Sequence, residues 1–177
     1  MPPQGGTGLI GLRIHWLIPP LLAGLVSAAG TAIHPDPPWW AIVFAALCLV
    51  PLARRDRYVW LRVALLVGAS WGALSLAIMG SAWLYRFIQG PTNAAIGGVI
   101  GALLVGIAAR LLVPLRLKAR AVATMVALAA GAGAVLGAGP TVAGYIGVFL
   151  WQLSVGGVLA RARTESAPTG VLQEEMA

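Results

Sequence analysis

Residues that perform acid–base, nucleophilic or metal chemistry are scarce in this 177-residue chain and lie far apart. The two histidines, His15 and His34, stand at opposite ends of one apolar stretch, about 28 Å apart by helical rise, so one monomer cannot clamp a haem between them. Neither a serine nor the single Cys48 has a histidine at its own depth, which disfavours a nucleophilic dyad. No Gly-Lys-Ser/Thr phosphate loop occurs. The sequence therefore indicates no catalytic residue, no cofactor and no metal site.

The acidic residues all lie outside the apolar stretches. They are Asp36, Asp56, Glu165, Glu174 and Glu175, in connectors or in the C-terminal tail. A transporter coupled to protons or sodium commonly carries a carboxylate inside the bilayer, where a charge is costly and is kept for function. Such coupling is therefore disfavoured, although backbone carbonyls remain an alternative set of Na⁺ ligands.

The polar groups that do enter the apolar stretches are uncharged. Gln152, in Trp151-Gln152-Leu153-Ser154, lies near the middle of the last stretch, and Ser70 reaches a similar depth in the third. A buried amide in hydrocarbon needs hydrogen-bond partners. We expect Gln152 to bond across helices, with a wet, ligand-facing cavity as the alternative, and we name Gln152 and Ser70 as candidate ligand positions.

Composition places the chain in a membrane. It is 59% hydrophobic and 10% charged, with a mean hydropathy of +0.88, whereas a soluble domain carries about 25% charged residues. The net charge of +7 does not point to nucleic acid, because the basic residues lie in short connectors between apolar stretches. The single cysteine excludes a disulfide framework within the chain.

Six apolar stretches predict an all-α, polytopic membrane protein with a bundle of about six transmembrane helices, in a domain over 14–161. A crossing helix needs about 20 residues, with a range of roughly 17–25, so the second and fifth stretches are borderline and length alone leaves five or four spans open. The stretches are Trp16–Ile33, Pro37–Ala53, Val59–Met79, Asn93–Leu112, Ala121–Ala138 and Pro140–Ala160.

The basic residues favour six spans and orient them. When alternate connectors are assigned to opposite sides, every Lys and Arg except Arg86 falls on one side, which the positive-inside rule makes the cytoplasm. Without the short second span, the cluster Arg54–Arg62 would lie outside. The N-terminus and C-terminus are therefore predicted to be cytoplasmic, in a membrane that we expect to be a prokaryotic plasma (inner) membrane.

The two ends of the chain are predicted to be mobile. Residues 1–13 form a cytoplasmic head, and residues 162–177 form a polar, disordered tail. An alternative is that Arg13, the first apolar stretch and its small residues form a cleavable signal peptide, which would leave five spans. The interrupting Pro19-Pro20 pair argues against that alternative and predicts a kink in the first helix.

A second polar cluster lies on the predicted outer side, in the connector 81–92 and the start of the fourth helix. Its candidate ligand positions are Arg86, Gln89 and Asn93. Arg86 is favoured as a solvated arginine beside interfacial aromatic residues. The alternative is that it binds an anion or a lipid phosphate at the mouth of the bundle, where a helix N-terminus favours negative charge.

Small residues spaced four apart predict close helix packing, because helices in lipid associate through backbone approach rather than through apolar burial. We favour packing within the chain over a dedicated dimer face. The pairs are Gly24 with Ala28, Gly68 with Gly72, Gly97 with Gly101, and Gly133 with Gly137.

Gly90-Pro91-Thr92 recurs as Gly139-Pro140-Thr141, each copy opening a predicted inward-running helix. The recurrence indicates either a parallel internal repeat, as in many transporters, or coincidence in a glycine-rich chain. The stretch Gly139–Gly147 also resembles the Gly-Pro-Thr-Gly-Gly-Tyr element of biotin-uptake substrate-binding subunits, which are six-helix proteins of similar length. The match covers under ten residues and departs at Val142 and Ala143, so no family is assigned from it.

Three function classes remain. The first is a small-molecule transport or permeation component, favoured by six spans, the repeat and Gln152. The second is a non-catalytic accessory or assembly subunit of a larger membrane complex, favoured by the small-residue faces. A membrane enzyme acting on lipid is the weakest, because acidic, His and metal-binding groups are missing. The expected partners are the lipid bilayer and either a homo-oligomer or a larger complex, with no nucleic acid.

Overall fold

The computed structural model describes residues 15–33, 38–52, 57–113, 115, 117–139 and 142–166. The predicted head 1–13 lies outside the described residues, and so do the tail beyond 166, His34, and Pro140-Thr141 of the second Gly-Pro-Thr copy. All regular structure in the described part is helical, which confirms the all-α prediction.

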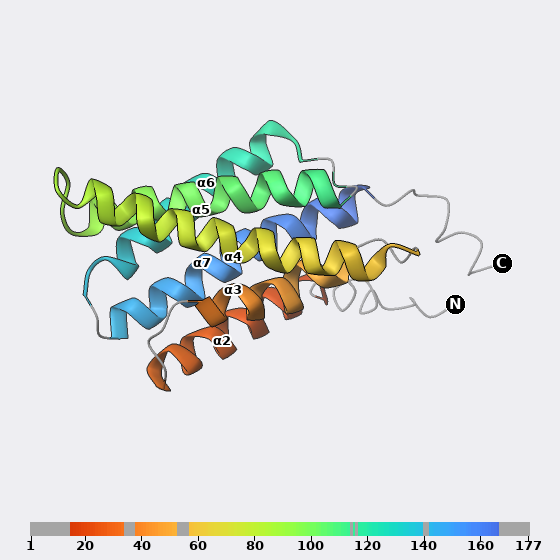
Figure 1. Cartoon of the computed structure of the whole chain (residues 1–177), viewed down its shortest axis with the longest axis horizontal. Coiled ribbons are helices and arrows are strands. Elements are labelled where there is room, and N and C mark those ends of the chain that lie inside the picture. Colours follow the sequence, from red (N-terminus) through yellow and green to blue (C-terminus); the bar gives the residue numbers. More distant parts are fainter. Residues whose placement is uncertain are drawn as a thin grey trace, which may run out of the picture.

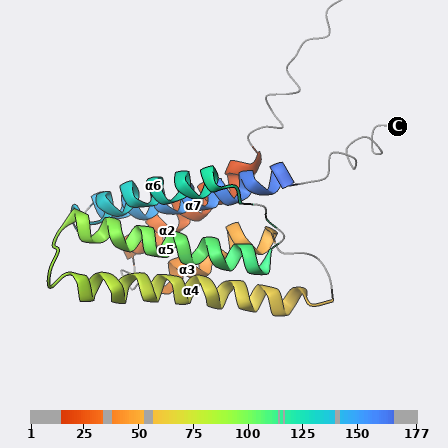
Figure 2. The ribbon, with the colours of Figure 1, turned by 90° about the horizontal axis from the view of Figure 1, so that it is seen from above.

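The chain forms six rods that run roughly along one axis and alternate in direction (Figure 1). Each rod packs against its neighbours in the sequence, and the last packs against the first, so the rods close into a ring. Figure 2 shows α5 between α4 and α6. The rods are η1–α2 (His15–Leu17, Ile18–Ile33), α3–η2–η3 (Pro38–Phe44, Ala45–Leu49, Val50–Leu52), α4 (Val59–Leu84), α5 (Pro91–Leu112), α6 (Ala119–Leu136) and α7 (Val142–Ser166).

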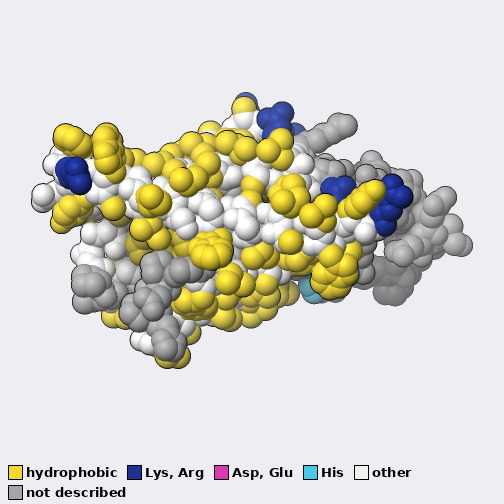
Figure 3. All heavy atoms as spheres, in the orientation of Figure 1, with side chains coloured by type: hydrophobic (Ala, Val, Ile, Leu, Met, Phe, Trp, Pro, Cys, Tyr) yellow, Lys and Arg dark blue, Asp and Glu magenta, His cyan; other side chains and the backbone are white. Residues whose placement is uncertain are grey.

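Five of the rods are long and apolar enough to cross a membrane. The second rod is shorter, with its apolar helical part at Trp39–Leu52. The membrane-protein interpretation is therefore supported by five helices, while the six-span count and the cytoplasmic termini remain predictions. Figure 3 shows apolar side chains over the middle of one face and Lys and Arg toward its ends.

The short second rod is irregular but lies deep in the bundle. Its seven-residue α3 passes into a π-helical turn at Ala45–Leu49 and then a 3₁₀ turn. Phe44, Ala45 and Leu49 are almost fully buried and belong to the main apolar core. Hydrogen bonds from neighbouring helices reach its first turn: Ser70 Oγ donates to the Ala41 carbonyl over 3.1 Å, and Gln152 Nε2 donates to the Trp40 carbonyl over 3.4 Å.

Three boundary predictions were wrong. The tail predicted to be disordered from residue 162 begins later, because α7 continues to Ser166. The connector expected at 81–92 begins later, because the apolar residues after Ser81 extend α4 to Leu84. The kink expected at Pro19-Pro20 is replaced by a helix start: α2 begins at Ile18, after a 3₁₀ turn, so both prolines lie in its first turn. A proline there removes no helical hydrogen bond, because the first N–H groups of a helix have no partner in it.

The start of α5 confirms the predicted role of Gly90-Pro91. Gly90 has φ of 69°, in the left-handed region that glycine adopts without a Cβ clash. Pro91 then occupies the first turn, where its missing N–H is not needed. This pair turns the chain sharply out of the connector and into α5.

Most of the glycine pairs pack within the chain, as predicted. A Cβ on Gly133 would overlap the Ala94 carbonyl oxygen. A Cβ on Gly98, which lies next to the predicted Gly97–Gly101 pair, would overlap the Ala129 carbonyl oxygen. The helices α5 and α6 therefore cross with their backbones in contact. A Cβ on Gly24 would lie 3.0 Å from the Phe149 carbonyl oxygen of α7. Close approach of this kind is how small residues hold membrane helices together.

Gly68 and Gly72 behave differently. Both are exposed on α4, and a Cβ added to either would meet no atom within 4 Å. Trp71, between them, is 51% exposed. This glycine pair therefore faces away from the ring, although its spacing equals that of the packed pairs.

Basic side chains gather at the end of the bundle where η1 begins and α7 ends. Arg62 Nη1 donates to the Leu112 carbonyl at the C-terminus of α5 over 3.3 Å, and Arg163 donates to the Pro51 carbonyl in η3. Glu165 forms ion pairs with Lys118 at 3.3 Å and with Arg161 at 3.1 Å. The two arginine bonds place positive charge at helix C-termini, where the backbone dipole favours it.

The glycine contacts predict opposite effects of one substitution at two sites. Gly98→Ala should lower the stability by about 1–3 kcal/mol, because its Cβ forces α5 and α6 apart. Gly72→Ala, the matched control on open surface, should cause no loss, since Ala is the better helix former by up to about 1 kcal/mol. Melting temperatures of the purified variants in mild detergent measure both. Equal losses would contradict this packing.

Candidate functional site

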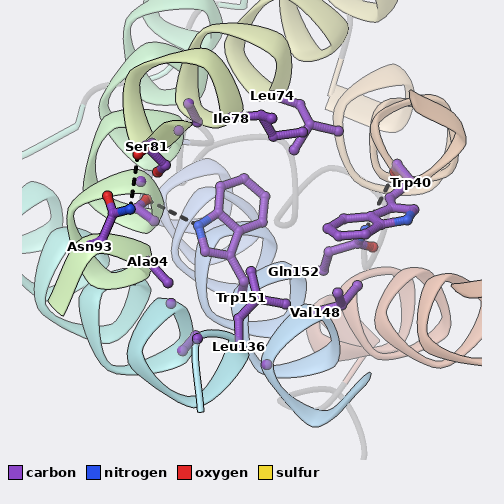
Figure 4. A pocket seen from close by; sticks show the side chains of 18 of the residues that line it. Trp40, Leu74, Ile78, Ser81, Asn93, Ala94, Leu136, Val148, Trp151 and Gln152 are labelled. Carbon is purple, nitrogen blue, oxygen red and sulfur yellow. Dashed lines mark hydrogen bonds between the residues drawn. The ribbon is translucent and has the colours of Figure 1, made fainter. Parts of the chain in front are cut away.

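A cavity of about 410 Å³ lies inside the ring, among α3, α4, α5, α6 and α7 (Figure 4). It is nearer the end that carries the α4–α5 connector, because Tyr85 and Gly90 line it. Glycine and alanine form much of the wall on α5, α6 and α7. Those small wall residues are Ala94, Gly97, Gly98, Gly101, Ala132, Gly133, Gly137 and Gly147.

Aromatic side chains form another part of the surface, beside aliphatic and polar ones. Trp151 projects from α7 into the middle of the cavity (Figure 4), and its ring centroid lies 5.6 Å from that of Phe44. Trp151 Nε1 donates to the Gly98 carbonyl over 3.1 Å, which holds the indole across the ring toward α5. No Asp, Glu, His, Lys or Arg is among the residues that line the cavity in the described part of the chain.

Gln152 is almost fully buried, with 2% of its surface exposed. Its Nε2 donates to Ser27 Oγ of α2 over 2.7 Å and to the Trp40 carbonyl of α3 over 3.4 Å. Because a backbone carbonyl only accepts hydrogen bonds, this contact requires the amide nitrogen to face α3. Gln152 therefore links α7 to both α2 and α3, which confirms the expected interhelical hydrogen bond.

Asn93 of α5 is also buried and also donates a hydrogen bond from its amide nitrogen to a neighbouring helix. It is 5% exposed, and its Nδ2 donates to the Ser81 carbonyl of α4 over 2.8 Å. That carbonyl also accepts the Tyr85 N–H at 2.8 Å, so Asn93 adds a second bond at the C-terminal end of α4. The nitrogen again faces an obligate acceptor, and this places the amide oxygen on the other side.

Three buried polar atoms, on residues that line the cavity, have no hydrogen-bond partner among the described residues. They are the acceptors Asn93 Oδ1 and Gln152 Oε1 and the donor Trp40 Nε1. Buried polar side-chain atoms usually have a partner, and an unsatisfied one costs about 1–3 kcal/mol. All three atoms are enclosed by the surrounding helices, with almost no accessible surface, although other atoms of the same residues line the cavity.

The structure brings together three of the five positions predicted from the sequence. Ser70, Asn93 and Gln152 all line the cavity. Arg86 and Gln89 are exposed in the connector and do not line it, although their neighbours Tyr85 and Gly90 do. Ser70 is 4% exposed and donates its hydroxyl to α3, so it serves packing as well as lining.

Sequence reasoning missed Trp40 and the glycine walls. Trp40 follows Trp39 at the start of an apolar stretch, where the preference of tryptophan for membrane interfaces predicts an interfacial position. One signal was present: Trp151 fell at mid-depth beside Gln152, where an interfacial tryptophan does not belong. That departure from the belt indicated an interior aromatic surface.

Comparisons of the chain with protein-family models, with curated proteins and with solved structures find no match. The function must therefore be argued from the cavity and the residues that line it. Within the described residues, no group of three His, Cys, Asp or Glu side chains could hold a metal ion.

The Gln152–Ser27 bond predicts a measurable coupling. Gln152→Leu and Ser27→Ala should each cost little stability, and the pair should cost less than the sum, by about 0.6 kcal/mol, the average for such bonds in membranes. Melting of the four proteins in detergent gives this cycle. As a control, the stability costs of Gln152→Leu and of Ser75→Ala should add in the double variant, because Ser75 lies on α4 and forms no bond with Gln152. Additivity in the Ser27 cycle would show that the bond does not form.

Proposed function

We propose that this chain is a multi-pass membrane protein that binds a small molecule in the cavity among α3, α4, α5, α6 and α7, as a transport or permeation component. The observation that carries this proposal is a cavity of about 410 Å³ inside a bundle of apolar helices, lined by small and aromatic residues together with Ser70, Asn93 and Gln152. Binding sites for small molecules are mostly apolar clefts with a few convergent polar groups, and volumes of about 300–1,000 Å³ are typical.

The position of the cavity supports transport over a purely structural role. Polar side chains that only join helices would have their polar atoms paired with one another. Here Asn93 and Gln152 join helices through their amide nitrogens, while neither amide oxygen has a partner among the described residues, and both residues line the cavity. With the orientation proposed from the basic residues, the cavity lies in the outer half of the bundle, and the α4–α5 connector is at its mouth.

The closed ring also suits a component that changes shape. The cavity is surrounded by α3, α4, α5, α6 and α7, and the contact between α5 and α6 depends on glycine. Small-residue interfaces have flat surfaces with little side-chain interlocking, so helices can slide or rock against each other. Parallel repeats that move in this way are common among transporters.

An accessory or assembly subunit is the second candidate, and one observation favours it. The exposed pair Gly68 and Gly72 lies on α4 with nothing against it in this chain, in contrast to the packed glycine pairs. Purification from mild detergent separates the two candidates. A stable isolated protein or homo-oligomer supports transport, and obligate co-purification of another membrane protein supports a subunit.

The proposed function predicts that water-soluble reagents enter the cavity. In a Cys48→Ala background, Ser81→Cys places a thiol on the cavity wall with little change in size. In proteoliposomes, a small charged methanethiosulfonate reagent should label Ser81→Cys several times faster than the matched control. Mass spectrometry of the intact protein measures the labelling.

The matched control is Ser75→Cys, which carries the same substitution on the same helix but does not line the cavity. If Ser81→Cys reacts no faster than Ser75→Cys, the cavity is closed to water and the proposed function fails. Labelling that saturates from one side of the membrane and then also blocks access from the other supports a permeation path through the ring.

A further inference from the structure

We infer that the cavity accepts an acyl chain of a bilayer phospholipid, which enters sideways beside α4 from the leaflet nearest the α4–α5 connector. This inference rests on the proposed function for its binding cavity and names the ligand. Three features carry it: the length of the cavity along the helices, the short α3 on one side of it, and a wall without charged side chains.

The cavity is long and runs along the helices. On α4 its lining begins at Ser70 and ends at Tyr85, a distance of about 22 Å by helical rise. On α5 the lining runs from Gly90 to Gly101, about 16 Å by the same rise. A volume of about 410 Å³ spread over this length makes the cavity narrow. Such a shape suits one extended chain that lies parallel to the helices.

The length of the cavity matches the depth of one leaflet. Its connector end lies beside Trp83, Tyr85 and Phe87, which are all exposed. Exposed tryptophan and tyrosine at the end of a spanning helix mark the membrane interface. Half of the hydrocarbon core is about 15 Å thick, so the cavity reaches from this interface to near the middle of the bilayer. The acyl chains of one leaflet extend over the same depth.

The second rod leaves the outer part of α4 uncovered on one side. Ser70 Oγ donates to the Ala41 carbonyl, which places the first turn of α3 beside Ser70. Because α3 begins at Pro38, it ends soon after this level, whereas α4 continues to Leu84, about 21 Å beyond Ser70. Figure 1 shows α4 running past the start of α3 toward the connector. Among the described helices, α5 packs along the other side of α4.

Residues in this uncovered part line the cavity and are also exposed. Ile78 and Tyr85 of α4 belong to the cavity wall, yet they are 42% and 55% exposed. On α7, Val148 also lines the cavity and is buried (Figure 4). Leu76 and Met79, close to Ile78 in the sequence, are exposed as well. The cavity is therefore continuous with the apolar outer surface of α4, which lipid chains cover in a membrane.

The chemistry of the wall suits a hydrocarbon chain. No charged side chain lines the cavity in the described part of the chain. The polar groups of the lining residues are directed at the protein: Ser70 Oγ and Trp151 Nε1 donate to backbone carbonyls. The amide oxygens of Asn93 and Gln152 have almost no accessible surface. An acyl chain forms no hydrogen bonds, so it gains dispersion contacts with this wall and leaves no polar group of its own unpaired.

Photo-cross-linking tests the inference on the full chain. The protein is reconstituted in phosphatidylcholine vesicles that contain a small fraction of phosphatidylcholine with a diazirine near the middle of one acyl chain. Light releases N₂ from the diazirine, and the carbene that forms inserts into the nearest bond. Mass spectrometry of peptides locates the adducts. We expect adducts on Val148, Trp151 or Gln152, which line the cavity, in addition to adducts on exposed residues such as Leu128 of α6.

A pair of matched variants tests the sideways entry. Ile78→Trp places a larger side chain at the opening and should lower the ratio of α7 cavity adducts to Leu128 adducts several-fold. Leu76→Trp carries the same type of change two residues away, at an exposed position that does not line the cavity, and should leave the ratio unchanged. Both positions are exposed, so neither change creates a clash in the core. If Ile78→Trp fails to fold, the adducts of the unmodified chain still decide the question.

The outcomes separate the ligand from the proposed function. Adducts confined to exposed residues, with none on the cavity residues of α7, overturn the inference. An unchanged ratio in Ile78→Trp, or an equal fall in both variants, overturns it too. Fast labelling of Ser81→Cys without cavity adducts leaves the proposed function intact and removes the lipid chain. Cavity adducts without that labelling support the lipid chain and overturn the permeation component.

Discussion

Backbone contact between α5 and α6 is the constraint on which the rest of the structure depends. At Gly98 and Gly133 there is no room for a Cβ, because each position faces a carbonyl group of the other helix. Apolar burial does little to join helices that are already in lipid, so this close approach must supply the packing. Two other glycines of α5 leave space on the side of the helix that faces the cavity. Gly97 and Gly101 face α4 and Trp151, and both line the cavity. The cavity is thus a consequence of how the helices are held together.

Much of this arrangement could be predicted from the sequence, and the exceptions have a common cause. Hydropathy placed the helices to within a few residues, since an apolar stretch needs no partner to be identified. Gln152 stands out in the sequence because a buried amide inside an apolar stretch is costly, and Asn93 because it belongs to the polar cluster of the α4–α5 connector. The direction in which each helix faces was not predictable. Gly68 with Gly72 and Gly97 with Gly101 have the same spacing, yet the first pair is open and the second is packed. Only the neighbouring helices distinguish them.

Charge acts at the ends of the bundle and not in the cavity. Arg62 and Arg163 donate to carbonyls at the ends of α5 and η3, and Glu165 pairs with Lys118 and Arg161. Each of these contacts joins two different segments or two turns of one helix at the basic end. The interior, by contrast, uses only amide, hydroxyl and indole groups. This division is what a low-dielectric surrounding favours, because neutral hydrogen bonds lose less solvation than ions when they are buried.

The irregular second rod connects packing with the cavity. Alone, seven residues of α3 followed by a π-helical turn would not form a stable helix, since short helices depend on tertiary contacts. Ser70 and Gln152 donate to two successive carbonyls in its first turn, and Phe44 and Leu49 bury its apolar face. The donors that hold α3 are thereby unavailable to a ligand, while Gln152 Oε1 and Trp40 Nε1 remain without partners. Packing of the second rod therefore sets the positions of Trp40, Phe44 and Gln152, which all line the cavity.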